Sequence, residues 1–131
     1  SSLQMNIKPL LVKIPEISMK ILPIYWAFLT YMLLKPGVEN KEYWFMFSGI
    51  DKIVHLSVFA TLGFLFRAAF PRLLFLYYIY ILLIYSFLTE ILQDEMGLGR
   101  SAELLDIVAD TIGFIIGYLI YRTVLRYISK P

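Results

Sequence analysis

Four long apolar runs divide this chain and limit what it can fold into. They cover residues 21–34, 53–66, 73–89 and 104–121, and most charged residues lie between them. A helix needs about 20 mostly apolar residues to cross a bilayer, whereas a membrane barrel would show short segments of alternating polarity. No such alternation is visible in the sequence. We therefore predict an all-α fold, a polytopic bundle of four transmembrane helices.

The composition agrees with a membrane protein. Hydrophobic residues make up 60% of the 131 positions, against roughly 45–50% in a typical soluble domain. The formal net charge of +2 is too small to indicate a nucleic-acid partner. The sequence has no cysteine, which excludes disulfides, a thiolate nucleophile and cysteine metal ligands.

The first two apolar runs are shorter than the usual spanning length. One of them being a re-entrant or interfacial segment therefore stays open as an alternative. Pro23 falls near the expected start of the first spanning helix, where its missing N–H costs little. Pro9 and Pro15 argue against a long helix before that point.

These observations predict three segments. Residues 1–19 form a cytoplasmic or interfacial N-terminal segment, of which residues 1–4 resemble a tag remnant. Residues 20–122 form the four-helix transmembrane domain. Residues 123–131 form a basic cytoplasmic tail.

The basic residues predict the orientation. If all four runs cross the membrane, the side that holds the two termini also holds eight basic residues: Lys8, Lys13, Lys20, Arg67, Arg72, Arg122, Arg126 and Lys130. The basic residues of the other side are mixed with acidic ones. The positive-inside rule then places both termini in the cytoplasm, an N-in/C-in topology.

Two carboxylates lie inside the fourth apolar run. Asp106 and Asp110 are followed by Gly113 and Gly117 at helical spacing, so the four residues share one narrow stripe. Lipid is a costly neighbour for such a stripe, and we expect it to face other helices. The two glycines would let a neighbouring backbone approach closely.

Polar residues of other segments are predicted at the same membrane level. They lie at the start of the second run, at the end of the third and just before the fourth. Intramembrane ionisable residues indicate a functional site, and we predict that these residues share a pocket that opens outward. The candidate residues are Asp51, His55, Glu90, Gln93, Arg100, Ser101, Asp106 and Asp110.

Several of these residues have simpler interpretations that stay open. Asp51 can serve as a helix-terminal charge, and His55 as a hydrogen-bonded packing residue. Glu90 and Arg100 can form a structural ion pair. Ser101 fits a helix N-cap better than a nucleophile. No recognised metal-binding spacing occurs, so the sequence assigns no metal ligand and leaves any cofactor unknown.

The order of these residues resembles the VanZ-like family of small bacterial membrane proteins. The resemblance covers about residues 20–122 and rests on Asp51-Lys52-x-x-His55, Leu62-Gly63, Glu90-x-x-Gln93, Gly99-Arg100-Ser101 and Asp106-x-x-x-Asp110-x-x-Gly113. The family usually has Asn where this chain has Asp110. The resemblance implies a multi-pass protein of the bacterial inner membrane. The founding member is associated with low-level resistance to teicoplanin, a lipoglycopeptide that targets cell-wall precursors.

Three function hypotheses follow. The favoured one is a protein that acts on or protects a cell-envelope component. Its partners would be membrane lipids and either a lipid-tailed antibiotic or a lipid-linked cell-wall precursor. The second is an intramembrane acid–base or metal-assisted hydrolase of an envelope lipid. The third is a structural protein whose polar cluster fixes helix register or docks another protein.

Overall fold

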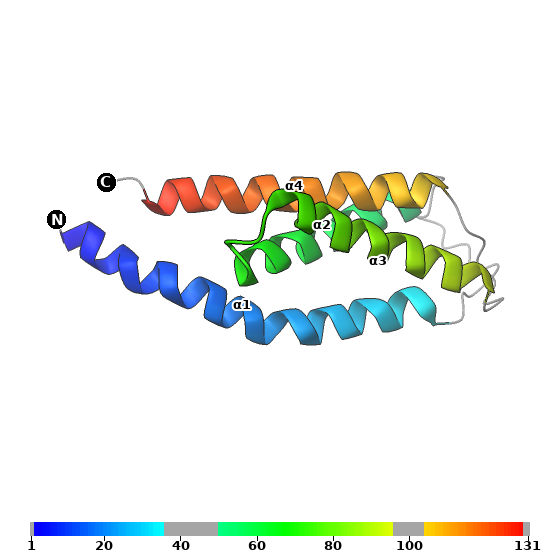
Figure 1. Ribbon diagram of the computed structural model, residues 1–131, viewed down its shortest axis with the longest axis horizontal. Coiled ribbons are helices and arrows are strands. Elements are labelled where there is room, and N and C mark those ends of the chain that lie inside the picture. The colour runs from blue at the N-terminus through cyan, green and yellow to red at the C-terminus, as the bar shows by residue number, and fades with distance from the viewer. Residues whose placement is uncertain (1, 36–49, 96–103, 130–131) are drawn as a thin grey trace.

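The computed structural model describes residues 2–35, 50–95 and 104–129, with the side chains of 11–35, 52–93, 95 and 104–129. Within these ranges the chain forms four helices and no strand: α1 (Ser2–Leu34), α2 (Ile50–Ala69), α3 (Phe75–Glu95) and α4 (Leu104–Ser129). Successive helices run in opposite directions along one long axis, as Figure 1 shows. Both chain termini lie at one end, called here the terminal end, and α2 and α4 begin at the opposite end. The predicted all-α fold is confirmed.

Each helix contains a stretch long and apolar enough to cross a membrane. In the described part of the chain these stretches are Leu11–Leu34, Lys52–Ala69, Phe75–Gln93 and Leu104–Ser129. Many large apolar side chains face outward, among them Phe28, Tyr31, Leu76 and Leu119. So large an apolar surface is unfavourable in water and is satisfied by lipid. The prediction of four helices long and apolar enough to span a membrane is confirmed. Each of the four is longer than a typical re-entrant segment.

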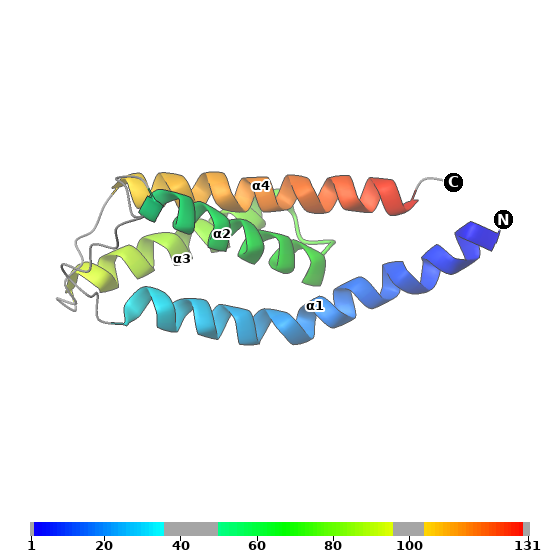
Figure 2. The same cartoon turned by 180° about the vertical axis from the view of Figure 1, so that it is seen from behind.

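The first helix begins much earlier than predicted. α1 has 33 residues and passes through Pro9, Pro15 and Pro23 without ending. The predicted start near residue 20 is therefore wrong. Each proline removes one backbone hydrogen bond, which bends a helix more often than it ends one when apolar residues continue on both sides. α1 is visibly curved in Figures 1 and 2.

The closest helix pair is α2 with α4. Gly113 lies against the backbone of Leu56, and Gly117 lies against the backbone of Ala60 and Phe64. The contact moves forward four residues on both helices, so the two helices run parallel. A Cβ at either glycine would overlap a carbonyl of α2. The close approach predicted for this glycine stripe is confirmed.

Aromatic side chains fill the centre of the bundle. Tyr78 of α3 is fully buried, and its hydroxyl donates a hydrogen bond of 2.5 Å to the carbonyl of Phe114 in α4. Its ring stacks on Phe66 of α2 at 5.7 Å between centroids. Trp26 of α1 packs edge-on against Phe66 and Tyr85. These contacts join all four helices.

A short turn at residues 70–74 connects α2 to α3. The guanidinium of Arg67 donates to the carbonyl of Leu73 and lies over the ring of Tyr118 in α4, 5.1 Å from its centroid. Arg67 therefore fastens this turn to α4.

Replacing Gly117 by Val should destabilise the bundle. The added side chain would meet the α2 backbone, which cannot move aside without separating the helices, and overpacking of this kind costs about 1–3 kcal/mol. Thermal unfolding in detergent, followed by tryptophan fluorescence, measures the effect. The control is Ala27→Val, which places the same side chain on the exposed face of α1. Equal melting temperatures for the two variants would contradict the proposed close packing.

Candidate functional site

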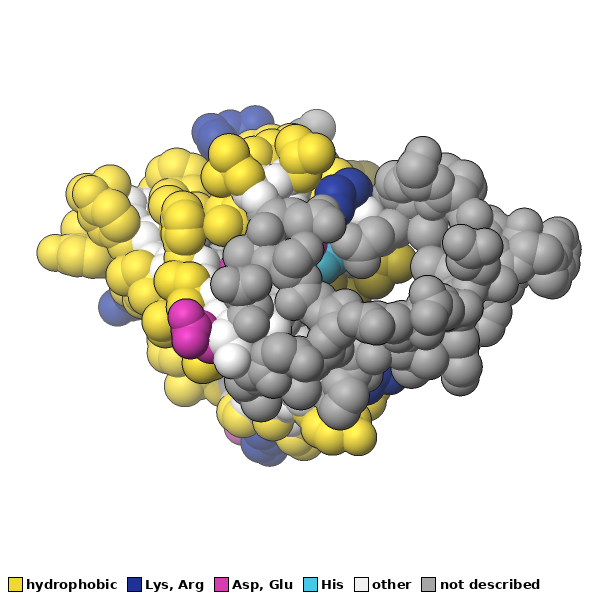
Figure 3. Space-filling model, turned by 90° about the vertical axis from the view of Figure 1, so that its right-hand side faces the viewer, with side chains coloured by type: hydrophobic (Ala, Val, Ile, Leu, Met, Phe, Trp, Pro, Cys, Tyr) yellow, Lys and Arg dark blue, Asp and Glu magenta, His cyan; other side chains and the backbone are white. Residues whose placement is uncertain are grey.

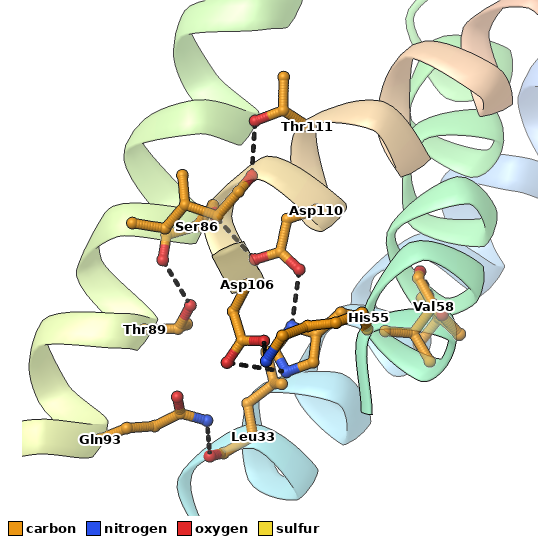
Figure 4. Close-up of polar contacts among 12 residues, drawn as sticks. Leu33, His55, Val58, Ser86, Thr89, Gln93, Asp106, Asp110 and Thr111 are labelled. Atoms are coloured by element: carbon orange, nitrogen blue, oxygen red, sulfur yellow. Dashed lines mark hydrogen bonds and ion pairs between the residues drawn. The ribbon is translucent and has the colours of Figure 1, made fainter. Parts of the chain in front are cut away.

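Three helices bring polar side chains together toward the end where α2 and α4 begin. Asp106 and Asp110 lie one turn apart on α4 and point toward the interior of the bundle (Figure 4). α2 contributes Lys52 and His55, and α3 contributes Ser86. The spacing of the two aspartates on one helix face is what lets both reach α2.

Asp110 lies between a histidine and a serine. Its Oδ1 is 2.7 Å from His55 Nδ1, and its Oδ2 accepts a hydrogen bond of 2.7 Å from Ser86 Oγ (Figure 4). All three residues are buried. When Asp110 is ionised its carboxylate can only accept, and the imidazole then donates from Nδ1. The carboxylate thus fixes the orientation of the ring.

The other edge of the imidazole faces Asp106. Its Nε2 is 3.8 Å from Asp106 Oδ2, longer than a hydrogen bond, and Asp106 Oδ1 is 2.7 Å from Lys52 Nζ. Lys52, Asp106, His55, Asp110 and Ser86 therefore form a continuous series, called here the polar chain.

Exposure falls along the polar chain. The exposed fraction of the side chain is 29% for Lys52, 8% for Asp106, 5% for His55 and 1% for Asp110. Lys52 and Asp106 are therefore the members of the polar chain nearest the surface, and Asp110 is the innermost carboxylate.

Glu90 of α3 lies beside the inner part of the polar chain. It is buried, and ligand atoms of His55, Glu90 and Asp110 all lie within 4.8 Å of one another. Imidazole nitrogen and carboxylate oxygen are common ligands of divalent transition metals. These three residues are the ones that could hold such an ion, and each comes from a different helix.

Gln93 has a different role from the one predicted. Its Nε2 donates a hydrogen bond of 2.6 Å to the carbonyl of Leu33 near the end of α1 (Figure 4). It therefore joins α3 to α1. Of the two candidate residues on α3, Glu90 lies beside the polar chain, one helical turn from Ser86.

Some predicted site residues cannot be placed. Arg100 and Ser101 lie outside the described residues, as does the side chain of Asp51. The predicted Glu90–Arg100 ion pair, the cap by Ser101 and the outward opening of a pocket therefore stay predictions. Figure 3 looks onto this end, where the described surface is mainly hydrophobic with isolated charged side chains.

Sequence reasoning left two contributors out of its site list. Lys52 occurs in the Asp51-Lys52-x-x-His55 motif, but a lysine near a membrane surface is usually explained by snorkelling. Ser86 precedes Glu90 by four residues, yet a serine in a membrane helix commonly bonds its own helix backbone. Lys52 contacts Asp106 and Ser86 contacts Asp110 because α4 lies beside both α2 and α3, an arrangement that the sequence does not give.

Comparison with known families gives one match. The family model described as VanZ/LLP1 matches residues 5–126, which is nearly the whole chain. Neither the curated proteins nor the solved structures gave a match.

The His55–Asp110 contact can be tested directly because the chain contains one histidine. Asn at position 110 can accept from Nδ1–H and donate to Ser86, so Asp110→Asn should keep the ring in its Nδ1-protonated form. Asp110→Ala should lose that form and cost about 1–3 kcal/mol, because buried polar groups lose their partner. Nitrogen NMR of histidine-labelled protein and thermal unfolding give the two readouts. Identical imidazole spectra for the wild-type protein and Asp110→Ala would exclude the contact.

Proposed function

This chain belongs to the VanZ/LLP1 family, and from that premise we propose that it binds the polar end of a lipid-linked or lipid-tailed cell-envelope molecule in the bacterial inner membrane. The observation that carries the proposal is the polar chain. Side chains from three lipid-facing helices meet there, and exposure falls from Lys52 to Asp110. Ionisable residues inside membrane spans are rare and usually functional.

A purely structural role explains the site less well. α2 and α4 already pack backbone to backbone through Gly113 and Gly117, and α3 is joined to α4 by the Tyr78–Phe114 hydrogen bond. Holding the bundle together therefore does not require ionised groups, whose burial costs several kcal/mol each unless they are well paired. Their presence at one place is better explained by something they bind.

The position of the site fits an envelope ligand. The polar chain lies toward the end opposite both termini, so the N-in/C-in orientation predicted from the basic residues would place it toward the outer leaflet. Lys52 and Asp106 are the groups that an arriving head group would meet first. The apolar tail of the ligand would remain against the exposed faces of the helices.

The charges favour a head group that donates hydrogen bonds. The described ionisable side chains here are Asp106, Asp110 and Glu90 against Lys52 and His55. Carboxylates only accept when ionised, so they fit sugar hydroxyls or an amine. A glycosylated, lipid-tailed antibiotic and a lipid-linked sugar precursor both have this chemistry. Binding of either could produce the glycopeptide or teicoplanin resistance that the family resemblance implies.

The proposal predicts that variants of the site lose function but still fold. Asp106→Asn and His55→Gln preserve side-chain size but change charge or proton donation. We expect each variant to purify at near wild-type yield and to abolish the change in teicoplanin susceptibility that the wild-type chain confers on a bacterial host. Monodisperse yield in detergent and minimum inhibitory concentration are the two measurements.

Ser57→Ala is the matched control, because Ser57 is a small polar residue on the exposed face of α2. It should behave as the wild type in both measurements. If all site variants lose folded yield together, the polar chain is structural. If they fold and keep the phenotype, the proposed site is wrong. A wild-type chain that leaves susceptibility unchanged would reject the teicoplanin link.

Metal-assisted hydrolysis of an envelope lipid is the second candidate. It is favoured by one observation, the proximity of ligand atoms from His55, Glu90 and Asp110. A divalent ion there would activate a water molecule or polarise an ester or phosphoryl oxygen.

This candidate predicts that the purified protein retains about one divalent ion per chain. Glu90→Gln should lower that content, while Ser57→Ala should not. Elemental analysis after dialysis against metal-free buffer measures the ratio. Metal content near zero in protein that was never exposed to chelator, with no gain on adding Zn²⁺ or Mn²⁺, would remove this candidate.

A further inference from the structure

A second site lies at the terminal end of the bundle, away from the polar chain. Beyond the last turn of α2, α1 and α4 continue toward the chain ends (Figures 1 and 2). Near this end, α1, α4 and residues 64–65 of α2 enclose a groove of about 260 Å³, called here the terminal groove. Its apolar lining includes Ile14, Ile17, Ile21, Phe64, Val124 and Leu125.

The size of the terminal groove suits part of a hydrocarbon chain. At about 260 Å³ it is larger than the space that a single water molecule needs, and its lining is almost entirely apolar. The side chains around it belong to helices whose outer faces are already exposed to lipid. A lipid tail can therefore enter the groove from its ordinary surroundings.

Exposed basic residues occur next to lining residues in the sequence of both α1 and α4. Four exposed residues, called here the basic rim, are next in sequence to residues that line it: Lys13, Lys20, Arg122 and Arg126. In the described part of α1 and α4 near the groove, Glu16 is the acidic residue that opposes them. Lys13 lies in the first turn of the candidate span Leu11–Leu34, and Arg126 lies in the last turn of α4.

We propose that the terminal groove and the basic rim form a binding site for one anionic membrane phospholipid. One acyl chain occupies the groove, and the phosphate lies among the basic side chains. Basic clusters between transmembrane helices attract anionic head groups in this way. A second copy of the chain fits less well, because two basic rims would repel each other. This inference does not depend on the proposed function of the polar chain.

Native mass spectrometry of the full chain in mild detergent tests the site. The probes are phosphatidylglycerol and phosphatidylcholine with identical acyl chains, added at equal concentration. We expect one retained phosphatidylglycerol per chain and a clear preference over phosphatidylcholine. Lys20→Gln combined with Arg122→Gln should reduce that preference by roughly fivefold per removed charge.

The matched control removes the same charge elsewhere. Lys35→Gln with Arg72→Gln changes one residue near the opposite end of α1 and one in the α2–α3 turn, outside the terminal groove. It should keep the preference. An equal loss in both double variants would show general surface attraction and overturn the site, as would equal binding of the two lipids by the wild type.

Filling the terminal groove gives an independent readout. Ile17→Trp replaces a half-exposed lining residue, so folding should be retained, and circular dichroism checks this. The variant should lose the phosphatidylglycerol adduct although all four rim charges remain. Full retention of the adduct would show that no acyl chain occupies the groove. A dimer without retained lipid would assign this surface to a second copy and reject the proposal.

Discussion

The hydrogen bond between His55 and Asp110 is the interaction on which the arrangement of this site depends. A carboxylate that is almost completely buried between lipid-facing helices needs strong partners, and Asp110 has two, the imidazole at 2.7 Å and the Ser86 hydroxyl at 2.7 Å. Because the partners come from α2 and α3, one side chain of α4 contacts both of these helices. The position of Asp106, one turn earlier, then follows from the helix geometry.

This contact is possible because the helices approach so closely. Gly113 and Gly117 bring the α4 backbone against that of α2, which shortens the distance that a short aspartate side chain must cover. In lipid there is no hydrophobic force between helices, so small residues and interhelical hydrogen bonds take over that role. The two glycines therefore allow α4 to approach α2 closely. Asp106 and Asp110, on the same face of α4, can then reach side chains of α2.

The sequence was sufficient for most of the fold and for the centre of the site. Four apolar runs predicted four spanning helices, and the helical spacing of Asp106, Asp110 and Gly113 predicted that they face the same neighbour.

Other features depend on tertiary contacts that no local sequence pattern records. α1 continues through three prolines, which local rules for proline do not predict. The side-chain amide of Gln93 donates to a backbone carbonyl of α1. The spacing of residues along the sequence does not indicate which neighbouring helix an amide will contact.

The parallel course of α2 and α4 has an electrical consequence. Both helices begin at the end where the polar chain lies, so the positive poles of two helix macrodipoles point toward its carboxylates, and Asp106 lies in the first turn of α4. At their other ends, Arg67 and Arg126 lie in the last turns, beside the negative poles. Because α1 and α3 run the opposite way, the two poles act locally, at the first and last turns of α2 and α4. A negative ligand group at the first pole and a positive one at the second would both meet a field already built into the backbone.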